Sequence, residues 1–226
     1  MNSQITILKV YNKAMYKYFV KKTRLITNRE KAEKLYKNYN IKTLLDLGSG
    51  SNPHREIRKS LGINQILVDI ASSNDVETVI PLNIMDFSAI TESLTKLIGK
   101  QQVDCVVALH VVEHFEKNDS LRLINHMHTW ANKMIIIETP NGFVKQEGTF
   151  ENPYQEHLCG YTVNELRQLG FKVTGTTGLK FLRNNHSKGS YKIKNTGVYI
   201  FDRIVFKYLH YFPKVSFNLF AYKILN

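Results

Sequence analysis

Short apolar runs of strand length alternate with stretches of helical period along the middle of the chain. The apolar runs predict β-strands at residues 43–47, 65–70, 79–82, 103–109 and 134–138. The periodic stretches predict helices at about residues 54–61, 88–99, 119–131 and 162–169. Alternation of strands and helices is typical of βαβ units, in which helices cover both faces of a parallel sheet.

The alternation of strands and helices ends at about Gly170. Two more strands are predicted after it, at residues 171–176 and 217–224. The expected fold is α/β, a Rossmann-like doubly wound seven-stranded sheet that is mostly parallel with an antiparallel last strand. The expected organisation is a basic amphipathic helical cap at residues 1–40, a main domain at 41–226, and an insertion at 177–215 between the last two strands.

Composition and charge indicate a globular protein with an anionic partner. The 226 residues are 43% hydrophobic and 22% charged, and the formal net charge is +12. This charge is uneven, because residues 1–44 hold 11 basic and 2 acidic residues, residues 45–178 hold 11 and 16, and residues 179–226 hold 9 and 1. The positive charge therefore belongs to the two ends, and the middle of the chain is acidic.

No sequence feature indicates secretion or a membrane span. Two cysteines are too few for a disulfide framework, no signal-type apolar region follows Met1, and no apolar run has the length of a spanning helix. We expect a cytoplasmic protein whose only membrane contact is peripheral, at the inner face.

A glycine turn, Gly48-Ser49-Gly50, follows the first predicted strand. In doubly wound sheets this turn lies where ligands bind, and glycine lets the backbone take φ > 0 or approach a ligand closely. A dinucleotide fingerprint needs a glycine where Pro53 stands, and a Walker loop needs Gly-Lys-Ser/Thr, so both are excluded. An ordinary tight turn is the alternative.

Three aspartates lie at the carboxyl ends of the first three predicted strands: Asp46, Asp69 and Asp86. Asp69 comes 19 residues after Gly50, close to the spacing at which a carboxylate binds ribose hydroxyls. Asp86 is followed by Phe87, which pairs an acceptor for an adenine amino group with a ring that packs on the base. Each aspartate alone is more often a helix N-cap or a turn residue, but three at one sheet edge favour an adenosyl pocket.

From about residue 44 to residue 175 the chain resembles the class I S-adenosylmethionine-dependent methyltransferases. The most specific element is Val112-Glu113-His114 after the fourth strand, which is similar to the corresponding loop of small-molecule and quinone-type enzymes. One departure is Asn52-Pro53, where the family has a third loop glycine, and this implies a slightly different turn. The matching segments are residues 45–50, 68–70, 85–87, 104–115 and 136–141.

The resemblance implies S-adenosylmethionine as the cofactor and implies its contacts. The glycine turn and Asp46 are expected at its methionine end, Asp69 at the ribose, and Asp86 with Phe87 at the adenine. The expected cofactor-binding residues are Asp46, Gly48, Ser49, Gly50, Asp69, Ile70, Asp86, Phe87, Leu109 and His110.

Methyl transfer to an oxygen needs an acceptor held in line and a base with a pKa near neutrality, which favours histidine. His110 leaves the fourth strand where the methyl group is expected, and the long polar stretch 139–157 is the expected acceptor lid. The expected catalytic residues are His110, His157, Glu113 and Tyr154. The alternatives are that His110 only frames the cofactor and that Glu113 and His114 cap the following helix.

No metal site is expected, because His110 and His114 lie in one loop, His157 and Cys159 lie in another, and the sequence shows no further catalytic ligand. The segment 152–154, Asn-Pro-Tyr, is similar to a motif of nucleic-acid amino-methyltransferases, but that motif belongs directly after the fourth strand.

Basic residues recur at helical spacing near both ends of the chain. They are Lys9, Lys13, Lys17 and Lys21 near the N-terminus, and Arg203, Lys207 and His210 in the aromatic-rich segment 198–212. One interpretation is that the first helix covers the cofactor pocket and the second is only an insertion. The sharper hypothesis is a site for an anionic or lipid-linked acceptor at a membrane surface.

The predicted function is S-adenosylmethionine-dependent methyl transfer, to an oxygen of a small, lipid-linked or glycan-linked metabolite. An RNA methyltransferase is an alternative that the charge permits. A non-catalytic binding protein with the methyltransferase fold is the alternative from another class. No oligomeric state is predicted.

Overall fold

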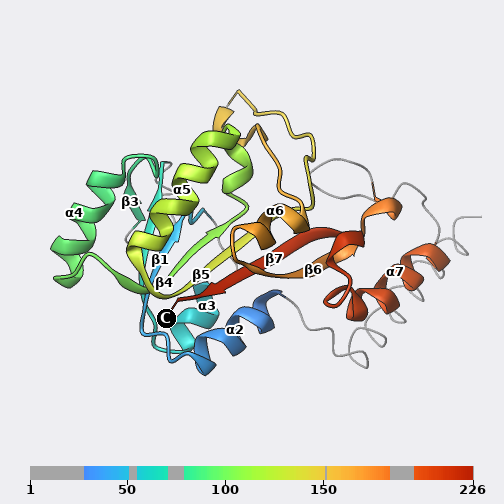
Figure 1. The fold of residues 1–226 in the computed structure, drawn as a ribbon, viewed down its shortest axis with the longest axis horizontal. Coiled ribbons are helices and arrows are strands. Elements are labelled where there is room, and N and C mark those ends of the chain that lie inside the picture. The colour runs from blue at the N-terminus through green and yellow to red at the C-terminus, as the bar shows by residue number, and fades with distance from the viewer. Residues whose placement is uncertain (1–27, 51–54, 71–78, 151, 184–195, 226) are drawn as a thin grey trace, which may run out of the picture.

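The computed structural model describes residues 28–50, 55–70, 79–150, 152–183 and 196–225, and it confirms the predicted α/β fold. Seven strands form one sheet in the order β3-β2-β1-β4-β5-β7-β6 (Figure 1). Every neighbouring pair is parallel except the two pairs that involve β7. The strands are β1 (Thr43–Leu47), β2 (Asn64–Asp69), β3 (Val79–Pro81), β4 (Val103–Leu109), β5 (Ala131–Pro140), β6 (Lys172–Leu179) and β7 (Ser216–Ile224).

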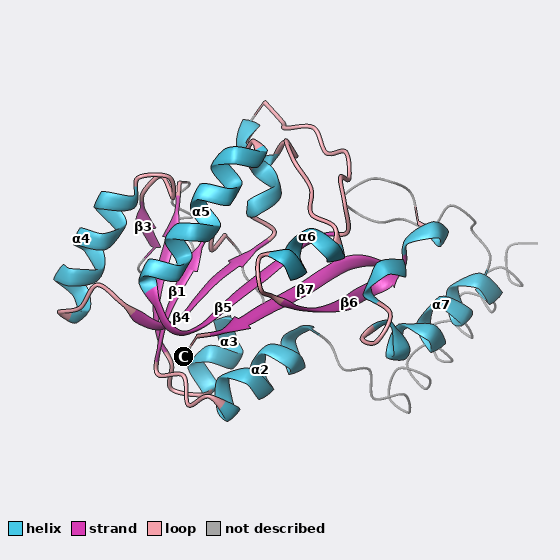
Figure 2. Cartoon of the chain, viewed as in Figure 1, coloured by secondary structure: helices cyan, strands magenta, loops and turns pink. Residues whose placement is uncertain are grey.

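Helices cover both faces of the sheet (Figure 2). Successive residues of a strand point to opposite faces, so Leu45 of β1 packs in the core beneath α4, α5 and α6, whereas Leu44 packs against α2. The helices are α2 (Asn28–Asn38), α3 (Arg55–Ser60), α4 (Phe87–Ile98), α5 (Lys117–Trp130), α6 (Val163–Gln168) and α7 (Thr196–Leu209). The α2 helix lies in the segment that was expected to form a helical cap.

Strand β5 is longer than predicted at both ends. It begins at Ala131, directly after α5, and continues through Thr139 and Pro140, which were expected in the acceptor lid. Thr139 is fully buried, and Pro140 pairs with Asn218 of β7. The antiparallel partner extends the ladder, and this pairing is not visible in the local pattern. The loop therefore begins after β5, and residues 141–161 are called the acceptor loop below.

The segment between β6 and β7 contains η3 (Lys180–Leu182), α7 and η4 (Pro213–Val215). It begins after Leu179 rather than at residue 177, because β6 is longer than predicted. The buried carboxylate of Asp202 in α7 accepts hydrogen bonds from the Leu179 amide at 2.6 Å and from Arg183 Nη2 at 2.8 Å. These bonds anchor α7 to the end of β6.

Most of the basic residues that recur at helical spacing near the two ends lie outside the described residues. Lys9, Lys13, Lys17 and Lys21 are not among the described residues, and neither are the side chains of Arg203 and Lys207. Within the described ranges, no helix combines the length and the apolar character needed to cross a membrane.

Candidate functional site

The glycine turn after β1 packs against the loop after β4. Gly48 has a φ of +64°, a left-handed conformation that favours glycine. Any side chain there would place its Cβ 2.6 Å from Cγ2 of Val111. The Ser49 amide donates to the Val68 carbonyl at 3.1 Å, which ties the turn to β2. Glycine at position 48 therefore lets the turn pack closely on Val111, while Gly50, at the carboxyl edge of the sheet, is exposed.

Asp69, at the end of β2, is bonded to this turn. Its Oδ2 accepts a hydrogen bond from the Gly50 amide at 2.8 Å. The next residue, Ile70, is exposed although its side chain is apolar. A carboxylate and an apolar surface beside a glycine turn suit the ribose and the base of a nucleoside.

Asp46 lies beneath the turn, within the core. Its Oδ2 accepts a hydrogen bond from Arg58 Nη1 of α3 at 2.5 Å, and both side chains are fully buried. Burial disfavours the guanidinium charge, but Asp46 and Tyr36 stabilise it, so the pKa of Arg58 is raised. Asp46 therefore holds α3 to β1 through a buried ion pair, in addition to any role at the methionine end of a cofactor.

Asp86 and Phe87 form the start of α4. The Asp86 carboxylate accepts hydrogen bonds from the Ala89 amide at 3.0 Å and from the Ser88 hydroxyl at 2.8 Å, and these bonds lower its pKa. Phe87 stacks on His126 of α5, with ring centroids 3.7 Å apart. Asp86 is thus a helix N-cap with an exposed carboxylate, and the Phe87 ring packs α4 against α5.

His110 lies between two carboxylates at the ends of β4 and β5. Its Nδ1 is 3.1 Å from Glu113 Oε1, and its Nε2 is 3.6 Å from Glu138 Oε1. Leu109, the last residue of β4, is the register partner of Glu138. Burial opposes the charged imidazolium, but the two carboxylates prevail and raise the pKa of His110 to about 10. Its side chain is 44% exposed, so a molecule bound at this edge of the sheet can reach it.

Glu113 is buried within η1 (Val112–His114) and is 1% exposed. Burial raises the pKa of a carboxyl group, but the bond from His110 outweighs this effect and lowers the pKa of Glu113. Its Oε1 faces His110, whereas its buried Oε2 has no hydrogen-bond partner within the described part of the chain. A buried carboxylate oxygen left in this way costs free energy, unless something outside the described structure binds it.

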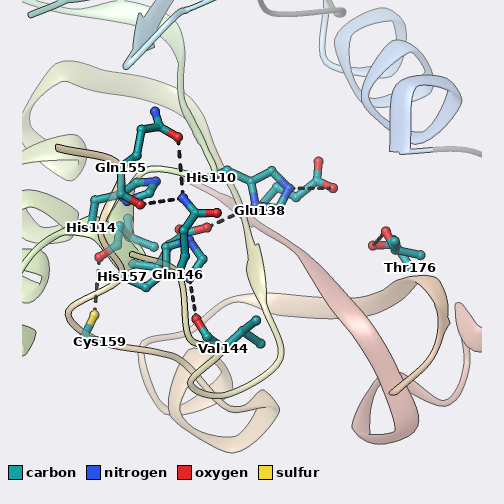
Figure 3. Close-up of polar contacts among 12 residues, drawn as sticks. His110, His114, Glu138, Val144, Gln146, Gln155, His157, Cys159 and Thr176 are labelled. Atoms are coloured by element: carbon teal, nitrogen blue, oxygen red, sulfur yellow. Dashed lines mark hydrogen bonds and ion pairs between the residues drawn. The ribbon is translucent and has the colours of Figure 1, made fainter. Parts of the chain in front are cut away.

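The acceptor loop folds back onto η1. The amides of Leu158 and Cys159 both donate to the Glu113 carbonyl, at 2.9 and 3.1 Å. His157 Nδ1 lies 2.6 Å from the Val144 carbonyl, and burial lowers the pKa of His157. In Figure 3, His157 and His114 lie on one side of His110, and Glu138 lies on the other.

Three of the four expected catalytic residues come together, and one does not. His110, Glu113 and His157 cluster at the carboxyl ends of β4 and β5. Tyr154 lies on η2 (Pro153–Gln155), in the outer part of the acceptor loop, and is 64% exposed.

Glu138 and Asn28 join this cluster although neither was predicted as a site residue. Asn28 Nδ2 donates to Glu138 Oε1 and lies 3.4 Å from Thr176 Oγ1. Glu138 carries a usable signal, since it is the charged residue at the end of the predicted apolar strand 134–138, as Asp69 is near the end of the strand predicted at 65–70. Asn28 carries none, because it is 110 residues from Glu138 along the chain.

Comparisons with known proteins bear on the fold. No protein-family model and no curated protein matches the sequence. The solved structure of the plantazolicin methyltransferase BpumL, in complex with a triazolic desmethylPZN analog and SAH, is similar over 100% of both chains, with 16% identity and a TM-score of 0.51.

A second solved structure is the 1,6-didemethyltoxoflavin-N1-methyltransferase of Burkholderia thailandensis, with bound 1,6-didemethyltoxoflavin and S-adenosylhomocysteine. It is similar over 100% of this chain and 90% of its own, with 12% identity and a TM-score of 0.50. With the observed strand order and the single antiparallel strand, these similarities show that the chain has the fold of the class I S-adenosylmethionine-dependent methyltransferases.

Proposed function

We propose that this protein binds S-adenosylmethionine and transfers its methyl group to an oxygen of a small, lipid-linked or glycan-linked metabolite. The observation that carries the proposal is the contact between the glycine turn and Asp69, through the Gly50 amide at 2.8 Å. It places a carboxylate suited to ribose hydroxyls beside a glycine turn whose Gly50 is exposed.

The residues of the turn fit an adenosyl cofactor. Gly48, Ser49 and Gly50 offer close backbone approach, Asp69 offers a hydrogen-bond acceptor, and Ile70 offers an exposed apolar surface. The exposed carboxylate of Asp86 is available to an adenine amino group while it caps α4. When bound, S-adenosylmethionine supplies an electrophilic methyl group on a sulfonium.

The acceptor is proposed to bind beside His110. Leu109 and His110 leave β4 next to Val111, which contacts the glycine turn, so cofactor and acceptor would lie side by side. Glu113 and Glu138 hold the His110 ring from both sides, and fixed orientation of this kind is a large part of catalysis by displacement. His157, on the acceptor loop, would border the acceptor, whereas Tyr154 lies on the outer part of that loop.

Calorimetry with S-adenosylmethionine and S-adenosylhomocysteine tests the cofactor assignment. We expect both ligands to bind, and we expect Asp69→Ala and Gly48→Val to abolish binding. Asp119→Ala is the control, because this aspartate is ion-paired with Arg122 on α5 and takes no part in the glycine turn. Unchanged affinity in both site variants would refute the assignment, and absence of binding by the wild-type protein would favour the non-catalytic alternative.

Transfer of labelled methyl groups into a fractionated lysate tests the acceptor class. The label is expected in the small-molecule or lipid-extractable fraction, and it should require both the protein and the cofactor. Label confined to RNA would instead support the RNA methyltransferase alternative.

A membrane surface is the proposed location of a lipid-linked acceptor. The α7 helix and the residues that follow it expose several aromatic side chains and a lysine, a combination suited to the boundary of an anionic bilayer. These residues are Phe201, Tyr208, Tyr211, Phe212 and Lys214. Co-sedimentation with vesicles that contain anionic lipid should show salt-sensitive binding, and its absence would remove this part of the proposal.

A further inference from the structure

Two histidines and a glutamate from segments far apart in the chain converge beside the proposed acceptor site. Glu113 and His114 belong to η1, and His157 belongs to the acceptor loop. One ligand atom from each of the three residues lies within 4.8 Å of the other two. The rings of His114 and His157 meet edge to face, with centroids 4.9 Å apart.

Both histidines are oriented by backbone carbonyls. His114 Nδ1 lies 2.8 Å from the Glu156 carbonyl, and His157 Nδ1 lies 2.6 Å from the Val144 carbonyl. A ring that donates its Nδ1–H to a carbonyl carries a lone pair on Nε2, which is the tautomer that binds a metal. Both rings are therefore in the tautomer of a metal-binding histidine. Each is held by a backbone carbonyl, which is a common partner of such histidines.

Glu113 adds a carboxylate oxygen that the described protein does not satisfy. Its Oε1 is bonded to His110, but its buried Oε2 has no hydrogen-bond partner in the part of the chain that the structure describes. A cation bound here would interact with this buried oxygen. Neither His114 nor His157 donates a hydrogen bond to it. Buried oxygens of this kind call for an explanation, and a bound ion is one.

The backbone around the three residues is fixed before any ion binds. The amides of Leu158 and Cys159 donate to the carbonyl of Glu113, so the residue after His157 is tied to the glutamate itself. With the bond from His114 to Glu156, the two segments are joined on both sides of the ligand set. Such cross-linking is the support that a binding site needs.

From this geometry we infer a binding site for a divalent transition-metal ion, of the zinc class, formed by Glu113, His114 and His157. Two imidazoles and one carboxylate suit zinc or cobalt better than magnesium, which prefers oxygen ligands alone. Zinc lies about 2.0–2.2 Å from such ligands. Tetrahedral ligands at this distance are roughly 3.4 Å apart. Atoms that lie within 4.8 Å of one another can reach that separation by side-chain rotation.

Three protein ligands leave a coordination position for a ligand from outside. If the proposed function holds, that ligand is an oxygen of the methyl acceptor, since the site adjoins His110 through Glu113. This extension rests on the proposed function, but the metal site itself does not.

Metal binding by the full chain, without an affinity tag, tests the inference. The protein is stripped with a chelator and titrated with Co²⁺, followed by its visible absorption, and with Zn²⁺ and Mg²⁺ by calorimetry. We expect one equivalent of Co²⁺ with the spectrum of nitrogen and oxygen ligands, and an affinity for Zn²⁺ at least tenfold above that for Mg²⁺. A sulfur-to-cobalt band in the near ultraviolet would instead assign the ion to Cys159 or Cys105 and would overturn the site.

Variants of the three ligands are compared with a matched control. Glu113→Gln, His114→Ala and His157→Ala should each weaken Zn²⁺ binding by more than about tenfold, since even outer partners of metal ligands are worth 10–100-fold. His128→Ala is the control, because the Nδ1 of His128 also lies near a carbonyl, that of Ile124, but in another part of the fold. Equal binding by the control and the three ligand variants would overturn the inference.

A second measurement guards against misfolded variants. Zn²⁺ should raise the melting temperature of the wild type and of His128→Ala, and it should not raise that of a ligand variant that retains a cooperative melting transition. Binding of S-adenosylhomocysteine to the stripped protein separates the two proposals. If the cofactor binds and no metal does, only the metal site fails, and if the metal binds without the cofactor, only the proposed function fails.

Discussion

The carboxylates of the cofactor side and those of the acceptor side are held in different ways. On the cofactor side, Asp46 is bound by Arg58, 12 residues away, and Asp69 by Gly50, 19 residues away. On the acceptor side, Glu138 is bound by Asn28, 110 residues away, and one oxygen of Glu113 has no partner among the described residues. The first half is assembled from short-range contacts, and the second from segments that meet only in the folded protein.

This difference separates groups that stabilise the fold from groups prepared for a ligand. Asp46 and Asp86 already have a structural role without a ligand, since their hydrogen bonds secure α3 and α4. Glu113 and His110 form a chain of charged groups that ends in an unsatisfied oxygen. Substitutions on the cofactor side should therefore affect stability first, and substitutions on the acceptor side should affect binding first.

Breaking the buried pair beneath the glycine turn should have the largest effect. Arg58→Met leaves the Asp46 carboxylate charged and buried, so we expect the free energy of unfolding to fall by about 3–5 kcal/mol in chemical denaturation. The double variant Asp46→Leu/Arg58→Met removes both charges and should recover part of this loss. A loss below about 1 kcal/mol for Arg58→Met alone would show that the pair does not secure α3.

Gly48→Ala should be the next most disruptive change. The new side chain suffers both the left-handed backbone and a clash with Val111, so we expect a loss of about 3 kcal/mol. Gly99→Ala is the control, because Gly99 has a φ of +67° but nothing lies within 4 Å of the place that a Cβ would take, and the change should cost only about 1 kcal/mol. Equal losses would mean that contact between the glycine turn and the β4 loop is unimportant.

The buried Lys31 predicts a pH dependence on the acceptor side. Its Nζ donates to Thr174 Oγ1 and the Gly175 carbonyl, and burial, partly opposed by Glu138, lowers its pKa to about 8. Between pH 8 and pH 10.5 the unfolded chain binds this proton and the folded chain does not, so stability rises with pH. From pH 8 to pH 10, the free energy of unfolding of the wild type should rise by roughly 2 kcal/mol relative to that of Lys31→Met. A constant difference between the two proteins across this range would contradict the prediction.

The smallest effect is expected at Asp86, where stability and binding can be separated. Asp86→Ala removes the cap of α4 and should cost about 1 kcal/mol, whereas Asp86→Asn keeps an oxygen at the cap and should cost only a few tenths. If the carboxylate binds the adenine amino group, both variants should weaken binding of S-adenosylhomocysteine in calorimetry. If only the alanine variant does so, Asp86 acts through the helix alone.

Most of the fold was predictable because its signals are local. Strands β1 and β4 have the predicted bounds, and strands were predicted from residues 171 and 217, close to where β6 and β7 begin. The antiparallel last strand belonged to the expected fold as a whole, and the sheet confirms it. The errors lie where tertiary pairing extends an element, as at β5, where Thr139 and Pro140 continue the ladder with β7. No pattern of apolar residues near Pro140 indicates this extension, because the partner strand lies almost 80 residues later in the sequence.

The candidate site was predictable only in part. The glycine turn and Asp69 follow from strand ends and spacing, and the structure places them in contact. Phe87 shows why the rest could not be predicted. The sequence cannot show whether an aromatic residue faces a ligand or a neighbouring helix, and the Phe87 ring stacks on His126 of α5.

By itself, the sequence determined the α/β alternation and the glycine turn, because hydrophobic periodicity and backbone sterics act over a few residues. Only the tertiary structure decided that Asp46 pairs with Arg58, and that His157 comes to Glu113 and His114 across more than 40 residues of chain. Such contacts depend on how helices and long loops pack on the sheet. For that reason, two histidine-bearing loops that are separate in the sequence can form one binding site in the folded protein.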